Sequence, residues 1–181
     1  MTTPNPQPNF PPAELLPLLN EVTTLLKSTS STLSIAETAA GGLLSSSLLT
    51  LPGASTYYKG GLTLYTLPSR IAYAGWTQDT IAAYRGPTTT IVSGLAKHVR
   101  KDLESTYTLA ESGTAGPTGG NTENRRPGYV ALAVDCEEGC FVRELNTGLG
   151  GERVGNMVAF AVEGLRLLRD VLKGEAEGAK L

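Results

Sequence analysis

Apolar residues recur at helical spacing in three long segments of the chain. In the second of these segments, Val92, Leu95 and Val99 share one side, while lysine and arginine residues occupy the other. Positions three and four residues apart lie on one face of a helix, so each segment predicts an amphipathic helix packed against a core. The long segments are 13–28, 88–105 and 152–173, and shorter helices are expected at 43–51, 67–74 and 77–86.

Short runs rich in β-branched and apolar residues separate these helices and predict five strands. The last two runs are joined by four residues of turn type, which is typical of an antiparallel hairpin. Helices alternating with the earlier strands favour parallel pairing there, so the sheet is expected to be mixed. We predict a single-domain α/β fold, a three-layer αβα sandwich. The expected strands are 32–36, 61–66, 107–112, 128–135 and 140–147; the domain spans 13–173, between a Pro/Asn-rich disordered tail (1–12) and a frayed tail (174–181).

The composition excludes several function classes. A formal net charge of −2 gives no electrostatic support for a nucleic-acid partner. The chain has no run of 18 apolar residues that would span a membrane, and its first residues lack the features of a signal peptide, so we expect a cytoplasmic protein. With one histidine, His98, and no paired carboxylate motif, neither a metal nor another cofactor is expected. His98 lies beside an apolar stripe and is interpreted as a surface or half-buried helix residue.

Two cysteines, Cys136 and Cys140, lie four residues apart in the predicted hairpin. They are interpreted as reduced thiols, with a disulfide or a weak metal half-site as the alternatives.

Two glycine-rich loops follow predicted strands, one after Glu37 and one after Ser112. Backbone N–H groups at the Gly41-Gly42 helix start favour an anion such as a phosphate. Two such loops at strand ends of one domain predict a shared crevice for a phosphate-bearing or polar ligand. The second loop lacks the Gly-Lys-Ser/Thr ending of a P-loop.

A candidate nucleophilic hydroxyl is Ser55, in a Gly-Ala-Ser corner that is followed by Lys59 and Tyr65. Without a histidine, activation of such a hydroxyl needs a neutral amine, a tyrosine or a carboxylate nearby. An ordinary turn serine is the alternative interpretation of Ser55.

Four segments in order, AETAAGGLLSSSLLTLPGAS, KGGLTLYTLPSRI, ESGTAGPTGG and RPGYVALAV, resemble the CinA C-terminal domain family. The resemblance covers about residues 13–172. It implies an αβα domain that commonly self-associates, and hence a homo-oligomer. It also implies a nicotinamide-nucleotide amidase activity, which hydrolyses the amide of NMN to nicotinate mononucleotide and ammonia.

The resemblance assigns roles to individual positions. The family nucleophile falls on Ser55, the motif tyrosine on Tyr65 and the hydroxyl residue before the second loop on Ser112. The family lysine that serves as base falls on Arg70. The expected substrate-binding residues are Glu37, Thr38, Gly41, Gly42, Gly113, Thr114, Gly116 and Arg126.

Departures from the family pattern leave two hypotheses. Arginine has a pKa above ~12 and cannot accept a proton from Ser55, so Arg70 cannot replace the lysine as base. In the first hypothesis the chain is an amidase that uses Lys59, or less favourably Tyr65, as base, with Ser112 and loop N–H groups stabilising the oxyanion. In the second it is a catalytically lapsed member that acts as a nucleotide-binding or assembly module.

Overall fold

The computed structural model describes residues 9–176. Residues 1–8 of the expected N-terminal tail and 177–181 of the expected C-terminal tail lie outside the described residues. The described elements, in chain order, are η1 (Ala13–Leu15), α1 (Leu16–Ser28), β1 (Leu33–Glu37), α2 (Leu43–Leu48), η2 (Ala54–Thr56), β2 (Tyr58–Thr63), α3 (Leu67–Tyr73), α4 (Gln78–Ala83), α5 (Thr89–Leu103), β3 (Tyr107–Gly113), η3 (Glu123–Arg125), β4 (Tyr129–Cys136), β5 (Gly139–Asn146) and α6 (Arg153–Lys173).

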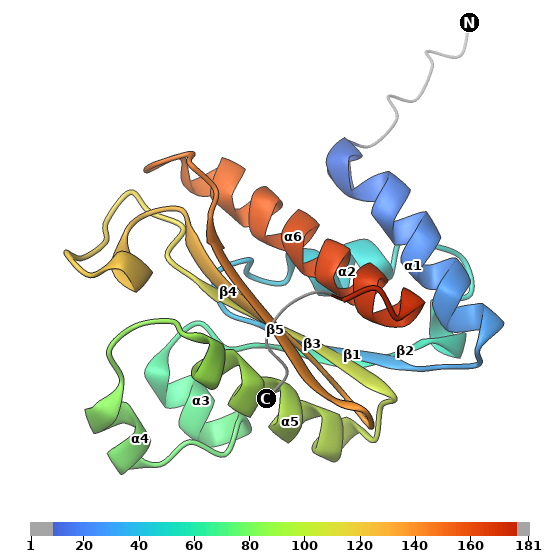
Figure 1. The fold of residues 1–181 in the computed structure, drawn as a ribbon, viewed down its shortest axis with the longest axis horizontal. Helices are drawn as coiled ribbons and strands as arrows, with labels where there is room; N and C mark the ends of the chain where they lie inside the picture. The colour runs from blue at the N-terminus through green and yellow to red at the C-terminus, as the bar shows by residue number, and fades with distance from the viewer. Residues whose placement is uncertain (1–8, 177–181) are drawn as a thin grey trace, which may run out of the picture.

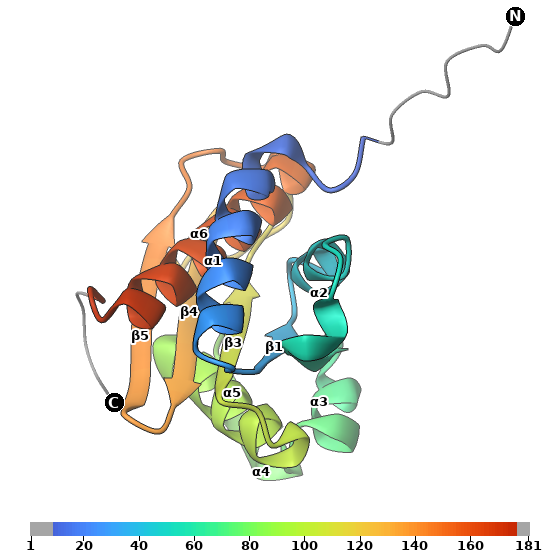
Figure 2. The same ribbon diagram turned by 90° about the vertical axis from the view of Figure 1, so that its right-hand side faces the viewer.

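The strands form one sheet in the order β2-β1-β3-β4-β5. β1 runs parallel to β2 and to β3, whereas β3–β4 and β4–β5 are antiparallel. Figure 1 shows α1 and α6 above the sheet and α3, α4 and α5 below it, and Figure 2 shows the same two groups of helices from the side. The predicted three-layer αβα sandwich with a mixed sheet is therefore confirmed.

The two faces of the sheet carry separate cores because strand side chains alternate in direction. Leu33, Ile35 and Leu109 belong to the core beneath α1, α2 and α6. Ala36 and Ala110, which directly follow Ile35 and Leu109 in their strands, belong to the core beneath α5. Alanines on this second face leave room for α5 to lie close to the sheet.

The strand order contains a topological switch at β1. The chain passes from β1 through α2 to β2 on one side, and then through α3, α4 and α5 to β3 on the other side. In open α/β sheets, ligands bind outside the carboxyl ends of the strands at such a point. Glu37 of β1 and Glu111 of β3 are register partners. A ligand site is therefore expected at the residues that follow them.

The predicted bounds of the second strand were wrong. β2 begins at Tyr58 rather than at Gly61, and it ends at Thr63 rather than at Thr66. The prediction interpreted the glycines as the start of the strand, but they lie within it because α2 crosses the sheet there. A Cβ atom at Gly61 would lie 2.5 Å from the hydroxyl oxygen of Ser45 in α2, so no larger residue fits without a shift.

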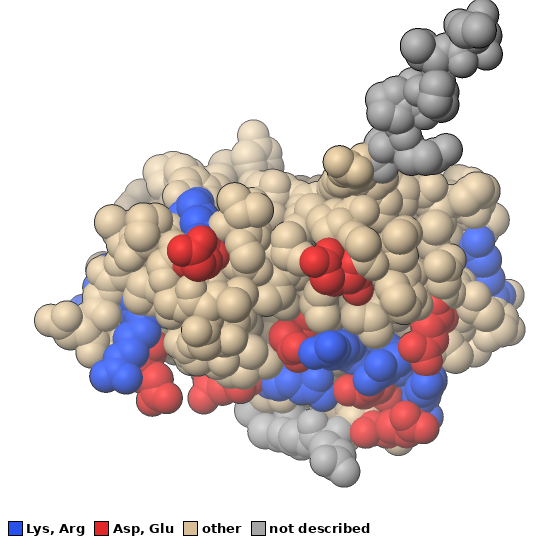
Figure 3. All heavy atoms as spheres, turned by 90° about the horizontal axis from the view of Figure 1, so that it is seen from above, with Lys and Arg blue, Asp and Glu red and all other residues tan. Residues whose placement is uncertain are grey.

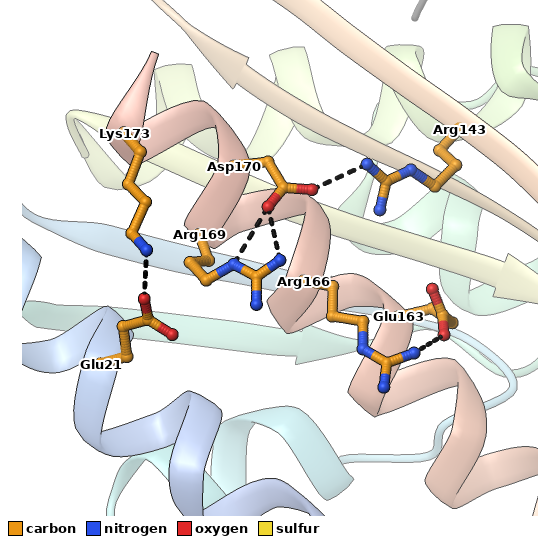
Figure 4. A network of polar contacts seen from close by, with 7 residues as sticks. All are labelled: Glu21, Arg143, Glu163, Arg166, Arg169, Asp170 and Lys173. Carbon is orange, nitrogen blue, oxygen red and sulfur yellow. Dashed lines mark hydrogen bonds and ion pairs between the residues drawn. The ribbon is translucent and has the colours of Figure 1, made fainter. Parts of the chain in front are cut away.

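Charged residues connect the C-terminal half of α6 to its neighbours (Figure 4). Asp170 accepts hydrogen bonds from Arg143 of β5 at 2.9 Å and from Arg169 at 2.7 Å. Burial acts to raise the pKa of Asp170, but the two guanidinium groups outweigh it and hold this pKa below its ordinary value. Lys173 pairs with Glu21 of α1, so the end of α6 is fixed to both a strand and a helix.

The two cysteines lie on opposite faces of the β4–β5 hairpin. Cys140 is the register partner of Asp135, and Cys136 is the partner of Gly139. Since Asp135 and Cys136 are adjacent in one strand, their side chains project to opposite faces. Both thiols are free and buried, which confirms the prediction of reduced thiols and excludes the disulfide alternative in this structure.

His98 is half-buried on α5, and its Nε2 atom lies 3.2 Å from Asp102, as expected for a helix histidine outside the site. Within residues 9–176, no group of three His, Cys, Asp or Glu side chains is placed to hold a metal ion. None of the helices in the same range is long and apolar enough to cross a lipid bilayer.

Candidate functional site

The carboxylate of Glu37 holds the first glycine loop and the start of α2. Its Oε2 atom accepts hydrogen bonds from the N–H groups of Gly42 at 3.0 Å and Leu44 at 2.9 Å. Its Oε1 atom accepts from the N–H and hydroxyl of Ser45 at 2.9 and 2.7 Å. The sequence predicted that these N–H groups would bind a phosphate and that Glu37 would bind substrate. The buried Glu37 carboxylate instead occupies the anion position itself.

The carboxylate of Glu111 likewise accepts hydrogen bonds from the preceding backbone N–H groups of the first glycine loop. Its Oε2 atom accepts hydrogen bonds from the N–H groups of Thr38 at 3.2 Å and Ala40 at 2.9 Å. Its Oε1 atom has no hydrogen-bond partner among the described residues. Burial raises the pKa of Glu111 to about 7, and the negative charge of Glu37 acts in the same direction, against the backbone hydrogen bonds. Glu111 was not among the predicted site residues, since a single carboxylate in an alternating strand carries no distinguishing pattern.

Thr38 and Ser112 meet at the switch point. The Oγ1 atom of Thr38 donates a hydrogen bond of 3.1 Å to the Oγ atom of Ser112. Thr38 follows the last residue of β1, and Ser112 follows Glu111 in β3, so the two parallel strands end with a pair of contacting hydroxyl groups. The structure thus brings together two of the residues that the sequence assigned to the site.

The second glycine loop is fixed by α6. Asn156 donates from its amide to the carbonyl of Ala115 at 2.9 Å, and Arg153 donates to the carbonyl of Gly116 at 2.7 Å. A Cβ atom at Gly113 would lie 2.7 Å from the ring of Phe160, which explains the glycine at the strand end. Gly116 has φ = +86°, a conformation that glycine adopts without strain.

Arg153 also connects this loop to the end of β2. Its second terminal nitrogen donates to the hydroxyl of Tyr65 at 3.4 Å, and the Tyr65 side chain is 64% exposed. Because the phenolic oxygen accepts this bond, the Tyr65 hydroxyl retains its own hydrogen for donation to a ligand. Arg153 was not among the predicted site residues, and only the fold places it beside Tyr65.

A pocket of about 420 Å³ opens beside the second loop, and its size suits a small organic ligand. Thr114 and Arg125 line it, whereas the predicted substrate-binding Arg126 does not, although it is exposed on the same loop. Asn124 closes one side by donating to the carbonyls of the 85–87 segment. The lining residues are Leu67, Tyr84, Gly86, Pro87, Gly113, Thr114, Thr118, Gly119 and Arg125.

Arg70 lies behind this pocket, with 4% of its surface exposed. Its guanidinium carbon lies 4.9 Å from the ring centroid of Trp76 and 5.2 Å from that of Tyr84. Its Nε atom donates to the carbonyl of Leu64 at 3.3 Å, and one terminal nitrogen has no partner among the described residues. The structure gives Arg70 a packing role, in which a buried cation is stabilised by two aromatic faces.

Ser55 and Lys59 do not reach this crevice within one chain. The exposed Ser55 lies in η2, just before Tyr58, and Tyr58 pairs with the first residue of β1. Ser112 lies beyond the last residue of β1, so the length of that strand, about 13 Å, separates the two ends. An oxyanion donor must lie about 3 Å from the reacting oxygen. The prediction that Ser112 and the loop N–H groups serve an oxyanion formed at Ser55 is therefore wrong within one chain, and the N–H groups at issue already bind Glu37 and Glu111.

Fold and site together define an α/β protein with a pocket beside the second glycine loop, next to the end of β3. The family model of the CinA C-terminal domain matches residues 16–172. The chain belongs to this family.

Curated relatives agree with this assignment, and a solved structure has the same fold. The chain is 34% identical over 159 residues to a CinA-like protein of Shewanella amazonensis, covering 88% of this chain and 37% of that protein. It is 32% identical to a CinA-like protein of Amoebophilus asiaticus, covering 85% and 36%. This chain thus spans little more than a third of the curated relatives that it matches. The competence/damage inducible protein of Agrobacterium tumefaciens has the same fold, with a TM-score of 0.81 at 24% identity over 90% of this chain and 97% of that one.

Proposed function

We propose that this chain binds a pyridine mononucleotide such as NMN between its two loops and hydrolyses the amide to nicotinate mononucleotide and ammonia. The observation that carries the proposal is the contact between Thr38 and Ser112 at the switch point. Ser112 directly precedes Gly113, which lines the pocket of substrate size, and the two buried hydroxyl groups offer a nucleophile and its hydrogen-bond partner. The reaction needs no cofactor, and we expect it to take place in the cytoplasm.

In the proposed reaction a hydroxyl group of this pair attacks the amide carbon. The direction of the hydrogen bond favours Thr38 as nucleophile, since its proton already points to Ser112. Glu111 holds the backbone of Thr38 and keeps one oxygen unpartnered among the described residues. With a pKa of about 7, it can take up the released proton at neutral pH. The Tyr65 hydroxyl donates to the oxyanion, and the proton held by Glu111 passes to the amide nitrogen as the C–N bond breaks, so that ammonia leaves. Water then hydrolyses the acyl-enzyme to nicotinate mononucleotide and restores the hydroxyl group.

The experiment measures ammonia release from NMN by purified protein, with Thr38→Ala and Ser55→Ala as a matched pair. We expect Thr38→Ala to lower the rate by at least about 100-fold, whereas Ser55→Ala leaves it unchanged. Loss of activity only in Ser55→Ala would return the nucleophile role to Ser55 and overturn the assignment to Thr38. Absence of ammonia release from the parent protein would refute the amidase proposal.

Arg70 favours a second function, nucleotide binding without hydrolysis. It stands where the family base is expected, and its buried guanidinium cannot accept a proton. Calorimetry that detects saturable NMN binding without ammonia release would support this function. Activity gained by Arg70→Lys would then identify the missing base as the reason that the parent is inactive.

A further inference from the structure

An arginine and a threonine on the wall of the pocket have hydrogen-bond donors without a partner. Arg125 and Thr118 both line this cavity of about 420 Å³. Neither side chain has a hydrogen-bond or ion-pair partner among residues 9–176. None of the described residues that line the pocket is Asp or Glu. The guanidinium and hydroxyl donors are therefore available to a ligand that supplies acceptors.

The loop holds Arg125 in place through its backbone and its glycines. The N–H of Gly120 donates to the carbonyl of Arg125 at 2.7 Å, and the N–H of Arg125 donates to the carbonyl of Thr122 at 2.9 Å. A Cβ atom at Gly86 would lie 2.8 Å from Cγ of Arg125, and one at Gly120 would lie 3.1 Å from its Nε atom. The arginine side chain thus lies against two glycines, where larger residues would displace it. A side chain that is already held loses less conformational freedom when it binds a ligand.

A second, buried cation lies behind the pocket wall. The guanidinium carbon of Arg70 lies 5.2 Å from the ring centroid of Tyr84, which lines the pocket. Arg70 has no ion-pair partner within the described range, and one terminal nitrogen makes no hydrogen bond there. A buried cation without a counter-ion is costly, so an anion in the adjacent pocket lowers its free energy. Figure 3 shows Lys and Arg side chains at the end of the molecule that carries the 114–128 loop, which is yellow to orange in Figure 1. The charge around the pocket favours an anion.

A terminal phosphate group suits these donors better than a carboxylate does. It carries a charge of about −1.5 to −2 at neutral pH and three strong acceptor oxygens. Two of these oxygens can accept the paired N–H donors of one guanidinium group, and the third can accept from a hydroxyl. A carboxylate has only two oxygens and a single charge. The first glycine loop is not an alternative phosphate site, because the carboxylate of Glu37 accepts from its N–H groups.

We propose that Arg125 and Thr118 bind the phosphate group of the nucleotide, so that Arg125 makes the pocket select nucleotides over the corresponding nucleosides. The inference rests on the proposed pyridine mononucleotide ligand, but it does not require that this ligand be hydrolysed. Gly113, the last residue of β3, lines the same pocket, so a nucleotide held by its phosphate at Arg125 lies beside the end of this strand. Arg126, the neighbouring residue that the sequence assigned to substrate binding, does not line the pocket.

A thermodynamic cycle between residue and ligand tests this assignment. Calorimetry measures the Kd of NMN and of nicotinamide riboside, which lacks only the phosphate, for the parent protein and for Arg125→Gln. Lys101→Gln, which removes an exposed positive charge of α5, is the matched control. We expect the parent to bind NMN at least about 100-fold more tightly than the riboside. Arg125→Gln should lose at least about tenfold in affinity for NMN and bind the riboside as the parent does, and Thr118→Val should lose about threefold for NMN alone.

Three outcomes would overturn the assignment. They are equal affinity of the parent for NMN and the riboside, an equal loss of both ligands in Arg125→Gln, and a loss in Arg126→Gln with none in Arg125→Gln. Inorganic phosphate that binds the parent as tightly as NMN does would exclude a nucleotide site. Circular dichroism establishes that each variant is folded.

The same measurements separate this inference from the amidase proposal. NMN binding that depends on Arg125, without ammonia release, would refute the amidase and support the phosphate site. If neither NMN nor the riboside binds the parent, ribose 5-phosphate is the second probe. Binding of this probe that Arg125→Gln weakens at least about tenfold would support a phosphate site for another ligand of this class. Absence of binding would overturn the inference.

Discussion

Glu111 makes a quantitative prediction about stability and pH. Its ordinary pKa is 4.5, and in the folded protein burial raises it to about 7. Between these two pH values the folded protein retains a proton that the unfolded chain has already lost. The free energy of unfolding therefore falls as pH rises from about 4.5 to about 7 and levels off above that.

The magnitude follows from the difference between the two pKa values. At about 1.4 kcal/mol for each pH unit, ionising Glu111 inside the protein costs about 3 kcal/mol. Glu111→Gln cannot ionise, and its amide oxygen can still accept the two backbone hydrogen bonds. Its NH₂ group replaces an oxygen that lacks a partner among the described residues, which adds a pH-independent cost of about 1–3 kcal/mol.

Urea unfolding from pH 4.5 to pH 8.5 gives the free energy of unfolding of both proteins. Contributions from other titrating groups, such as Asp135 and Asp170, cancel in the difference between the two. We expect the free energy of unfolding of the variant, relative to that of the parent, to be about 3 kcal/mol higher at pH 8.5 than at pH 4.5. Parallel curves would refute the reasoning, and Glu14→Gln, which removes one exposed carboxylate, is the matched control.

Four further predictions concern packing and thiols. Gly61→Ala should destabilise by about 1–3 kcal/mol, because its Cβ atom would lie 2.5 Å from a serine hydroxyl oxygen of α2. Gly94→Ala, in α5 with nothing within 4 Å of the new atom, should stabilise by about 1 kcal/mol, and urea unfolding measures both. Arg70→Ala should cost about 2–4 kcal/mol in the same assay, since it removes a buried stack and a hydrogen bond; a change within error would contradict the packing role. Cys136 and Cys140 should be unreactive toward a thiol reagent in the folded protein and both reactive in guanidinium; fewer than two thiols after unfolding without reductant would mean a disulfide.

Much of the fold could be predicted because its patterns are local. The stripe of Val92, Leu95 and Val99 gave α5 with bounds within two residues of those observed, since helical period and capping act over a few residues. The hairpin of β4 and β5 was predicted from its turn for the same reason. The start of β2 was missed because the reason for Gly61 is a helix that crosses the strand, and no neighbour in sequence reports that contact.

The candidate site divides in the same way. The sequence by itself located the two glycine loops, the hydroxyl residues Thr38 and Ser112, and an arginine in place of the family base. Only the tertiary structure decided that those two hydroxyls meet, that Ser55 lies at the far end of the strands, and that Arg70 is buried between aromatic rings. The physical reason is that the residue type determines the chemistry of a side chain. Which side chains contact one another and which are buried depend instead on which strands pair and which helices cover them.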